Sequence, residues 1–384
     1  MTQQQWPGSP WGPRQSSGWQ QTPFGQVQYS RGPVPRGQVV FGRPRRRRSL
    51  LGTLVRAMFL LAVMGFLGLL ALGWLLGQVV QTAPSTVPDP QTRVTAAPQD
   101  PATRAPAPQT TPAPPGEYQN DDYQVPPVAQ NPPGLPQPET YEEASQLLQA
   151  NPLYSTSVPR PVRCEMADID IERASRRELS AHLNEMMGCL MRVWEGPLDQ
   201  AGFTAVRPSV TVYSSSVTTK CGKLPRRNAV YCGADQQVYI ATDLPQVVPA
   251  RLRDSRFITE AVVAHEFGHA VQARSAVLAS ELAWEERSSK SVGLEYSRRL
   301  EVQADCFAGQ FLGSVQQSTL MTDQELDNVG RLFYSIGDDV LTGRRGYEGN
   351  HGSGQSRLEW TRKGLESTSV GACNSFAAPS SQVR

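Results

Sequence analysis

Acidic side chains are absent from residues 1–56 of this 384-residue chain, although that segment contains nine of its 37 basic residues. The rest of the chain is therefore acidic overall, even though the formal net charge of the whole chain is +2. An arginine-rich end next to an acidic body indicates a defined membrane topology and argues against nucleic acid as a partner.

Cysteine is absent from residues 1–163, and none of the six cysteines beyond that point belongs to a CxxC pair. The lack of such pairs excludes a zinc–thiolate site. An even number of cysteines confined to one part of the chain is typical of disulfide bonds formed in an oxidising compartment. The sequence leaves many pairings open, and the short loop CGKLPRRNAVYC favours a bond between its two ends. The candidate pairs are Cys221–Cys232, Cys164–Cys189 and Cys306–Cys373.

Charged side chains are also absent from residues 57–77, AMFLLAVMGFLGLLALGWLLG. The length of this segment matches the roughly 20 residues that an α-helix needs to cross a bilayer core. Because arginines crowd its amino-terminal flank, the positive-inside rule predicts a cytoplasmic amino-terminal segment and an exported remainder. A cleaved signal peptide would need an unusually long charged region. We therefore expect an uncleaved single-pass anchor in the cell membrane.

Two further segments lack the hydrophobic periodicity of a folded unit. The composition of residues 1–56 is typical of a disordered tail, with Gln, Gly, Pro and Ser before the arginines. Residues 78–139 are rich in proline, which favours a semi-rigid spacer, and half of the 32 prolines fall between residues 81 and 140. We therefore expect a cytoplasmic tail, a transmembrane helix, a Pro-rich linker and an extracytoplasmic domain over residues 140–384.

Residues 140–384 contain the patterns of helices and short strands. Apolar residues at helical spacing follow capping boxes that begin at Ser175 and Thr322, each with a glutamate three positions later. Short stretches rich in valine and tyrosine predict strands. Helices are expected over 175–198, 255–278, 291–315 and 322–339, and strands over 209–214, 228–233 and 236–241. This order predicts an α+β domain that is mostly helical with a small sheet.

Two of the four histidines stand in the stretch HEFGH, residues 265–269. Histidines four positions apart on a helix share one face, so the imidazoles of His265 and His269 can reach one metal ion. Glu266 lies beside the first histidine, where it can take a proton from a water that the metal activates. Zinc suits this set because it accepts nitrogen and oxygen ligands and keeps an open coordination position. The pattern predicts a catalytic site with one Zn²⁺ per chain, rather than a pair of structural histidines.

A catalytic zinc site needs a third protein ligand, and no further histidine follows His269 at a suitable spacing. Glu301 and Asp305 are four positions apart on a predicted helix that is otherwise mostly apolar. Because carboxylates are costly to bury without partners, their place in an apolar stripe favours a metal-linked role over a solvated one. We expect Glu301 to be the third ligand and Asp305 to orient a ligand histidine. The reverse assignment stays open.

Four blocks of the sequence resemble a known family. The blocks are HEFGH, LEVQADCFAGQF, CG…VYCGADQQVYIATD and GDD…HGSGQSRLEWTRKG. Over about residues 160–375 they are similar to the neutral zinc metallopeptidases, which are membrane-anchored bacterial zincins. The resemblance implies a zincin-like fold with His265, His269 and Glu301 as zinc ligands. It also implies that Glu266 is the catalytic base.

The remaining histidines are His182 and His351. His351 lies in the Gly-rich stretch GNHGSGQSR, and we expect this loop to bring His351 or Arg357 near the cleft, where either could stabilise an oxyanion. An exposed loop histidine is the alternative, and His182 is expected to be structural. Zincins commonly bind an extended substrate along an edge strand. Either residues 209–214 or residues 236–243 could form that edge.

These patterns predict a membrane-anchored zinc endopeptidase that cleaves peptide bonds of extracytoplasmic proteins or peptides. Glu266 would act first as a base and then as an acid toward the leaving amine. The main alternative is a non-catalytic envelope adaptor that keeps the fold, although an adaptor has no need of Glu266. A zinc hydrolase that acts on a non-protein wall polymer is a second alternative. The sequence does not determine the substrate or the oligomeric state.

Overall fold

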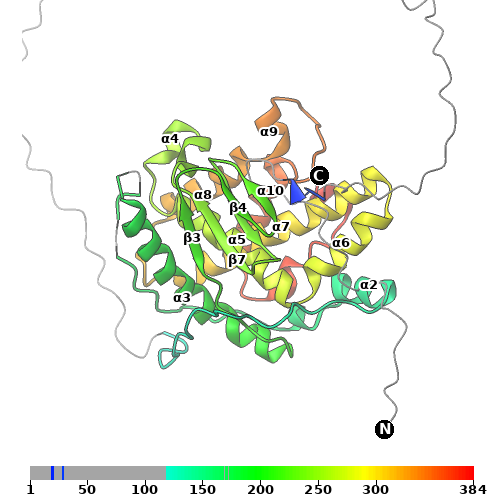
Figure 1. Cartoon of the computed structure of the whole chain (residues 1–384), viewed down its shortest axis with the longest axis horizontal. Coiled ribbons are helices and arrows are strands. Elements are labelled where there is room, and N and C mark those ends of the chain that lie inside the picture. The colour runs from blue at the N-terminus through cyan, green and yellow to red at the C-terminus, as the bar shows by residue number, and fades with distance from the viewer. Residues whose placement is uncertain (1–18, 21–27, 30–117, 168, 172) are drawn as a thin grey trace, which may run out of the picture. The chain divides into compact units, whose positions relative to one another are not determined.

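A computed structural model describes these parts of the chain: residues 19–20, 28–29, 118–167, 169–171 and 173–384 (Figure 1). The predicted transmembrane helix over residues 57–77 lies outside them, as do nearly all of the predicted cytoplasmic tail and the first part of the predicted linker. Among the residues that are described, no helix is long and apolar enough to span a bilayer.

Helices dominate the described part of the chain. The α-helices are α2 (Tyr141–Gln149), α3 (Arg176–Gln200), α4 (Ala250–Arg253), α5 (Ile258–Arg274), α6 (Val277–Arg287), α7 (Lys290–Val315), α8 (Asp323–Ser335), α9 (Asp338–Thr342) and α10 (Gly354–Glu366). The 3₁₀ turns are η1 (Pro152–Ser155), η2 (Leu244–Val247), η3 (Val370–Cys373) and η4 (Ser380–Gln382). The strands are β1 (Trp19–Gln20), β2 (Gln28–Tyr29), β3 (Val210–Tyr213), β4 (Val217–Thr219), β5 (Gly222–Leu224), β6 (Ala229–Cys232) and β7 (Gln237–Ala241). The predicted class, α+β with mostly helix and a small sheet, is confirmed, whereas the finer zincin-like assignment stays a prediction.

The sheet beside the central helices has three strands in the order β3–β7–β6. β6 pairs with β7 antiparallel, with Tyr231 opposite Val238. β3 pairs with β7 in parallel, with Val212 opposite Ile240. Because β7 is the central strand, the expectation that residues 236–243 could form a free edge is wrong. The two edges of this sheet are β3 and β6.

The helix α5, which carries the HEFGH motif, is buried along its whole length from Ile258 to Arg274. The strands β6 and β7 contact it, as do α3, α6, α7 and α8, and Figure 1 shows the green strands lying across it. The sequence predicted one helix over 255–278, but the chain is left-handed at Phe257 (φ 66°) and Ala276 (φ 62°), which delimit α5. Polar side chains on so enclosed a helix require partners from the surrounding elements.

The helix α7 packs closely against both α5 and α10. Gly268 of α5 faces Ala304 of α7, and a Cβ atom on Gly268 would lie 3.1 Å from the Cα of Ala304. Gly309 of α7 and Gly364 of α10 approach the backbone of the opposite helix even more closely, so a side chain at either position would clash. These close approaches allow side chains from α5, α7 and α10 to converge in one region.

The capping boxes predicted from the sequence are present at the starts of α3 and α8. The Ser175 side chain accepts a hydrogen bond from the Glu178 N–H, and the Glu178 carboxylate accepts one from the Ser175 N–H. Thr322 and Glu325 form the same reciprocal pair. Each box satisfies backbone donors that a helix start would otherwise leave without partners. The predicted starts of these two helices are confirmed.

Residues 118–139 fall in the segment predicted to be a linker, yet they pack against the domain. The Ala129 N–H donates to the Arg207 carbonyl at 3.1 Å, and the Gln236 side chain donates to the Pro133 carbonyl at 3.0 Å. Tyr118 is only 6% exposed. Extended proline-rich backbone keeps its carbonyl groups available to such donors, which explains how this segment docks without a helix or strand of its own. The folded part therefore begins before residue 140.

All six cysteines form disulfide bonds, and their pairing is the one that the sequence favoured. The bonds are Cys164–Cys189, Cys221–Cys232 and Cys306–Cys373. The first joins α3 to the segment that precedes it, and the second joins the β4–β5 hairpin to β6. The third joins α7 to η3 near the carboxyl end of the chain, which holds that end against the central helices.

Candidate metal centre

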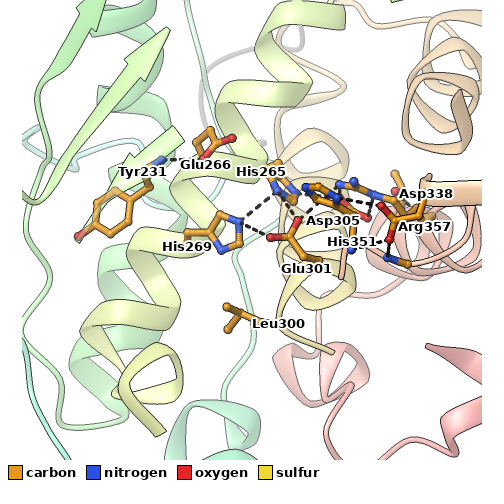
Figure 2. Close-up of polar contacts among 12 residues, drawn as sticks. Tyr231, His265, Glu266, His269, Leu300, Glu301, Asp305, Asp338, His351 and Arg357 are labelled. Atoms are coloured by element: carbon orange, nitrogen blue, oxygen red, sulfur yellow. Dashed lines mark hydrogen bonds and ion pairs between the residues drawn. The ribbon is translucent and has the colours of Figure 1, made fainter. Parts of the chain in front are cut away.

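Three side chains from α5 and α7 converge inside the domain (Figure 2). His265 Nε2 lies 3.2 Å from His269 Nε2 and 3.4 Å from Glu301 Oε2. His269 Nε2 lies 3.6 Å from Glu301 Oε1. A tetrahedral zinc ion with bonds of about 2.0–2.1 Å holds its ligand atoms about 3.3–3.4 Å apart. The three donor atoms therefore stand close to the spacing that zinc requires.

Glu301 is the carboxylate that faces both histidines. Its Oε2 is buried and accepts no hydrogen bond from a described residue. This oxygen lies 3.4 Å from His265 Nε2 and 4.0 Å from Arg357 Nη2 without a hydrogen bond, and a bound cation would stabilise it directly. Among the described residues, His265, His269 and Glu301 form the one group of three side chains able to hold a metal. The geometry supports Glu301 over Asp305 as the third ligand.

Asp305 contacts the opposite edge of the His265 ring. Its Oδ1 lies 2.8 Å from His265 Nδ1, and Arg357 donates two hydrogen bonds of 2.8 Å to the two oxygens of Asp305. A carboxylate at Nδ1 directs Nε2 toward the metal position and strengthens the imidazole as a ligand. The sequence suggested that Arg357 could reach the cleft. Its guanidinium lies 4.0 Å from Glu301 Oε2, and its side chain is 1% exposed and held by Asp305.

His269 is supported by neutral amides rather than by a carboxylate. Its Nδ1 lies 2.8 Å from Gln272 Oε1. The Gln272 amide donates in turn to the Leu300 carbonyl at 2.8 Å and to Gln303 Oε1 at 3.1 Å. Gln303 also donates to the Cys373 carbonyl, so the third disulfide adjoins this chain of amides. No motif in the sequence pointed to Gln272, although its position three residues after His269 puts it on the same helix face.

The charges in this cluster strongly affect one another. Burial alone would lower the pKa of His265, but the carboxylates of Asp305 and Glu301 outweigh burial and raise that pKa to about 10. Burial alone would raise the pKa of Glu301, but His265 and His269 outweigh it and lower that pKa to about 2. Carboxylates that stabilise an imidazolium here would also stabilise a divalent cation. Metal binding is therefore expected to release a proton.

Glu266 faces the sheet and not α7. Its Oε2 accepts a hydrogen bond of 2.7 Å from the backbone N–H of Tyr231 in β6. Burial raises the pKa of Glu266 to about 7, which suits a group that accepts and then releases a proton near neutral pH. By contrast, burial lowers the pKa of His269 to about 4, so its imidazole is neutral, as a metal ligand must be.

The strand beside the site is β6, an edge that no pattern in the sequence indicated. The N–H of Tyr231 is directed to Glu266 and so takes no part in the pairing of β6 with β7. No sequence pattern could have shown this contact, because a backbone N–H is the same for every residue except proline.

His351 is oriented by Asp338, the first residue of α9. Its Nδ1 lies 3.1 Å from Asp338 Oδ1, and Asp338 Oδ2 accepts the backbone N–H groups of His351 and Gly352. His351 is 3% exposed, so the alternative of an exposed loop histidine is wrong. The charge of His351 helps to lower the pKa of Glu301, which puts the ring within electrostatic range of the cluster. Its catalytic role stays a prediction, and Asp338 was missed.

A zinc metallopeptidase combines a helix that carries HExxH with a carboxylate ligand from a second helix. The glutamate of the motif is here buried beside a small sheet. The chain belongs to the family described as "Putative neutral zinc metallopeptidase", which matches residues 149–376. That interval contains α5 and α7 with every residue of the cluster, and also His351 and Arg357. The resemblance stated from the sequence is confirmed.

Two relatives illustrate how far the similarity extends. The uncharacterized protein YpfJ of Escherichia coli (strain K12) is 30% identical over 192 residues, which cover 48% of this chain and 66% of that protein. The uncharacterized protein Rv2575 of Mycobacterium tuberculosis (strain ATCC 25618 / H37Rv) is 31% identical over 206 residues, which cover 48% of this chain and 67% of that protein. The chain thus spans about two thirds of the length of these relatives. No solved structure matches.

Proposed function

We propose that this protein is a membrane-anchored, zinc-dependent endopeptidase that hydrolyses peptide bonds of extracytoplasmic proteins or peptides. The observation that carries the proposal is the spacing of 3.2–3.6 Å among the donor atoms of His265, His269 and Glu301. The buried carboxyl group of Glu266 next to these ligands favours a catalytic zinc over a structural one. Membership of a metallopeptidase family supports the same reaction.

Bound zinc would supply Lewis acidity, which acidifies a water molecule and polarises the carbonyl group of the scissile bond. Glu266 would take the proton from the attacking water and then deliver it to the leaving amine. The N–H of Tyr231 holds Oε2 of Glu266, which leaves Oε1 to carry the proton. His351, held by Asp338, would stabilise the negative charge that develops on the carbonyl oxygen. An extended substrate would pair with β6, the edge strand next to Glu266.

The proposed location is the outer side of the cell membrane. The apolar segment 57–77 and the arginines before it support a single-pass anchor with a cytoplasmic amino terminus. Three disulfide bonds in the folded part support an oxidising compartment for the domain. A peptidase in this position would meet extracytoplasmic polypeptides as substrates.

The proposal is tested by measuring zinc content and proteolysis with the full chain, prepared under oxidising conditions. The wild type is compared with Glu266→Gln and with Glu359→Gln, a control at an exposed acid of α10. We expect about one zinc per chain in all three proteins and hydrolysis of a protein mixture by the wild type and the control only. Zinc without hydrolysis in any of them would favour the adaptor. A wild-type chain that binds no zinc would overturn the ligand assignment and the mechanism.

A further inference from the structure

Arg298 of α7 is a buried arginine that the proposed reaction does not use. Its side chain is 5% exposed, and it stands three positions before Glu301, which puts the two residues on neighbouring positions of one helix face. A buried guanidinium is costly unless its N–H groups find acceptors. The acceptors of Arg298 therefore show which parts of the chain this residue holds.

Two backbone carbonyl groups from distant segments accept hydrogen bonds from Arg298. Nη1 donates to the Gly349 carbonyl at 2.8 Å, and Nε donates to the Val383 carbonyl at 2.9 Å. Both bonds start from a cation, and charge-assisted hydrogen bonds are stronger than neutral ones. One guanidinium thus ties residues 348–353, the segment that carries His351, and residues 382–384 to the helix that carries Glu301.

The bond to Gly349 is made two residues before His351. Gly349 lies against the Asp338 carboxylate, since a Cβ atom at this position would clash with it. Asp338 in turn accepts the backbone N–H of His351 and contacts its ring. Arg298 therefore holds the backbone that leads into His351, while Asp338 orients the side chain.

Residues 382–384 support the same segment from a second direction. Val383 is fully buried. The Ser353 N–H donates to the backbone oxygen of Arg384, and the Arg384 side chain donates to Glu348 at 3.0 and 3.2 Å. Both ends of the segment that carries His351 are thus tied to the stretch of chain that α7 holds.

We propose that Arg298 is a positioning residue that holds His351 in place beside the metal cluster. The inference rests on the proposed function, in which His351 stabilises the charge on the carbonyl oxygen of the scissile bond. Arg298 acts through the backbone at Gly349 and not on the substrate. A preorganised donor stabilises a transition state only while its position is fixed. Loss of Arg298 should therefore lower kcat and leave the proposed metal ligands unchanged.

The test compares Arg298→Met with the wild type in the full chain, prepared under oxidising conditions. Methionine keeps an unbranched side chain and removes every donor. Arg298→Lys keeps the charge but carries its donors on a single nitrogen atom, so it can replace one of the two bonds. Arg251→Met is the matched control, since Arg251 is exposed on α4.

Four measurements separate positioning from general damage to the fold. Hydrogen exchange followed by mass spectrometry reports the mobility of residues 348–353 without any substrate. Competition with a chelator reports zinc affinity, and steady-state kinetics with a peptide report kcat and KM. The double variant of Arg298→Met with His351→Ala completes a double-mutant cycle.

In Arg298→Met, the N–H groups of His351, Gly352 and Ser353 should exchange about tenfold faster or more, whereas α5 should exchange as in the wild type. The kcat should fall about tenfold, with KM and zinc affinity within about twofold of the wild type. Arg298→Lys should give intermediate values, and the control should match the wild type. His351→Ala should lower kcat by about 10²-fold, and adding Arg298→Met should lower it no further, because Arg298 acts through His351.

Unchanged exchange of residues 348–353 in Arg298→Met would overturn the proposal. A further loss of kcat in the double variant, or a loss of zinc together with activity, would overturn it as well. Should Arg298→Met not fold, Arg298→Lys alone decides, with faster exchange and a lower kcat expected. Faster exchange in Arg298→Met, with a wild type that hydrolyses no peptide, would overturn the proposed function and leave the hold of Arg298 on this segment confirmed.

Discussion

The candidate metal centre is supported differently on its two sides. On the helical side, side chains contact the proposed ligands, whereas on the sheet side a backbone N–H contacts the proposed base. Asp305 and Gln272 contact the rings of His265 and His269 through their own functional groups. On the sheet side, the N–H of Tyr231 donates to Glu266, while the Tyr231 ring is directed away from it (Figure 2).

This difference predicts how the two sides respond to substitution. Support by a side chain is lost when the residue changes, because the orienting group belongs to that residue alone. Support by a backbone N–H survives every substitution except proline. Conservative changes of Asp305 or Gln272, the supports on the helical side, should therefore have clear effects. Conservative changes of Tyr231, the support on the sheet side, should be tolerated. The two sides should also affect different quantities, since one supports the proposed metal ligands and the other supports the proposed proton acceptor.

The largest effect on peptide hydrolysis is expected at Glu266, which accepts the hydrogen bond from the sheet. Glu266→Gln keeps an oxygen for the Tyr231 N–H and removes the group that accepts the proton. The kcat for peptide hydrolysis should fall by about 10²–10⁴-fold, and zinc affinity should stay as in the wild type. Steady-state kinetics with a peptide substrate and a zinc-competition titration measure the two quantities. A loss of zinc together with activity would contradict the separation of the two sides.

Asp305→Asn should produce the next largest effect, and mainly on the metal. The substitution removes the negative charge at His265 Nδ1 and leaves the buried Arg357 without its carboxylate partner. Zinc affinity should fall by about 10–100-fold. The measurement is competition with a chelator of known affinity, with Asp323→Asn at an exposed position of α8 as the control. Wild-type affinity in Asp305→Asn would show that the carboxylate does not support the ligand.

Gln272→Leu tests the neutral support of the second histidine. Leucine has a similar size but cannot accept the hydrogen bond of His269 Nδ1. Zinc affinity should fall by less than in Asp305→Asn, by roughly threefold to tenfold, because a neutral hydrogen bond contributes about half as much as a charge-assisted one. The same competition assay measures it. A larger loss than in Asp305→Asn would reverse the order of the two supports.

The smallest effect is expected from Tyr231→Phe. The backbone N–H that contacts Glu266 remains, so hydrolysis and zinc affinity should change by less than about twofold. Tyr231→Pro provides the contrast, because proline has no N–H and edge strands tolerate it. Its kcat should fall by about tenfold while zinc stays bound. Equal activity of the Phe and Pro variants would show that the backbone contact does not matter for the base.

Local patterns in the sequence predicted the elements whose causes are local. The capping boxes at Ser175 and Thr322 determine where α3 and α8 begin, since they satisfy backbone donors within one turn. Valine- and tyrosine-rich stretches predicted β6 and β7, but not which strand lies at an edge, because strand order depends on contacts between distant segments. The proline content of residues 78–139 predicted a linker. Composition alone cannot show that residues 118–139 dock on the domain, because docking depends on contacts with distant segments.

The sequence by itself determined the residue types of the proposed metal site and the spacing of four that puts His265 and His269 on one face. Only the tertiary structure decided which carboxylate faces both rings, that Arg357 holds Asp305, and that Asp338 orients His351. It also decided that Glu266, the proposed base, accepts a hydrogen bond from a backbone N–H of β6. The physical reason is that helical periodicity acts over one turn, whereas orientation of a buried side chain requires partners from elements far apart in the chain.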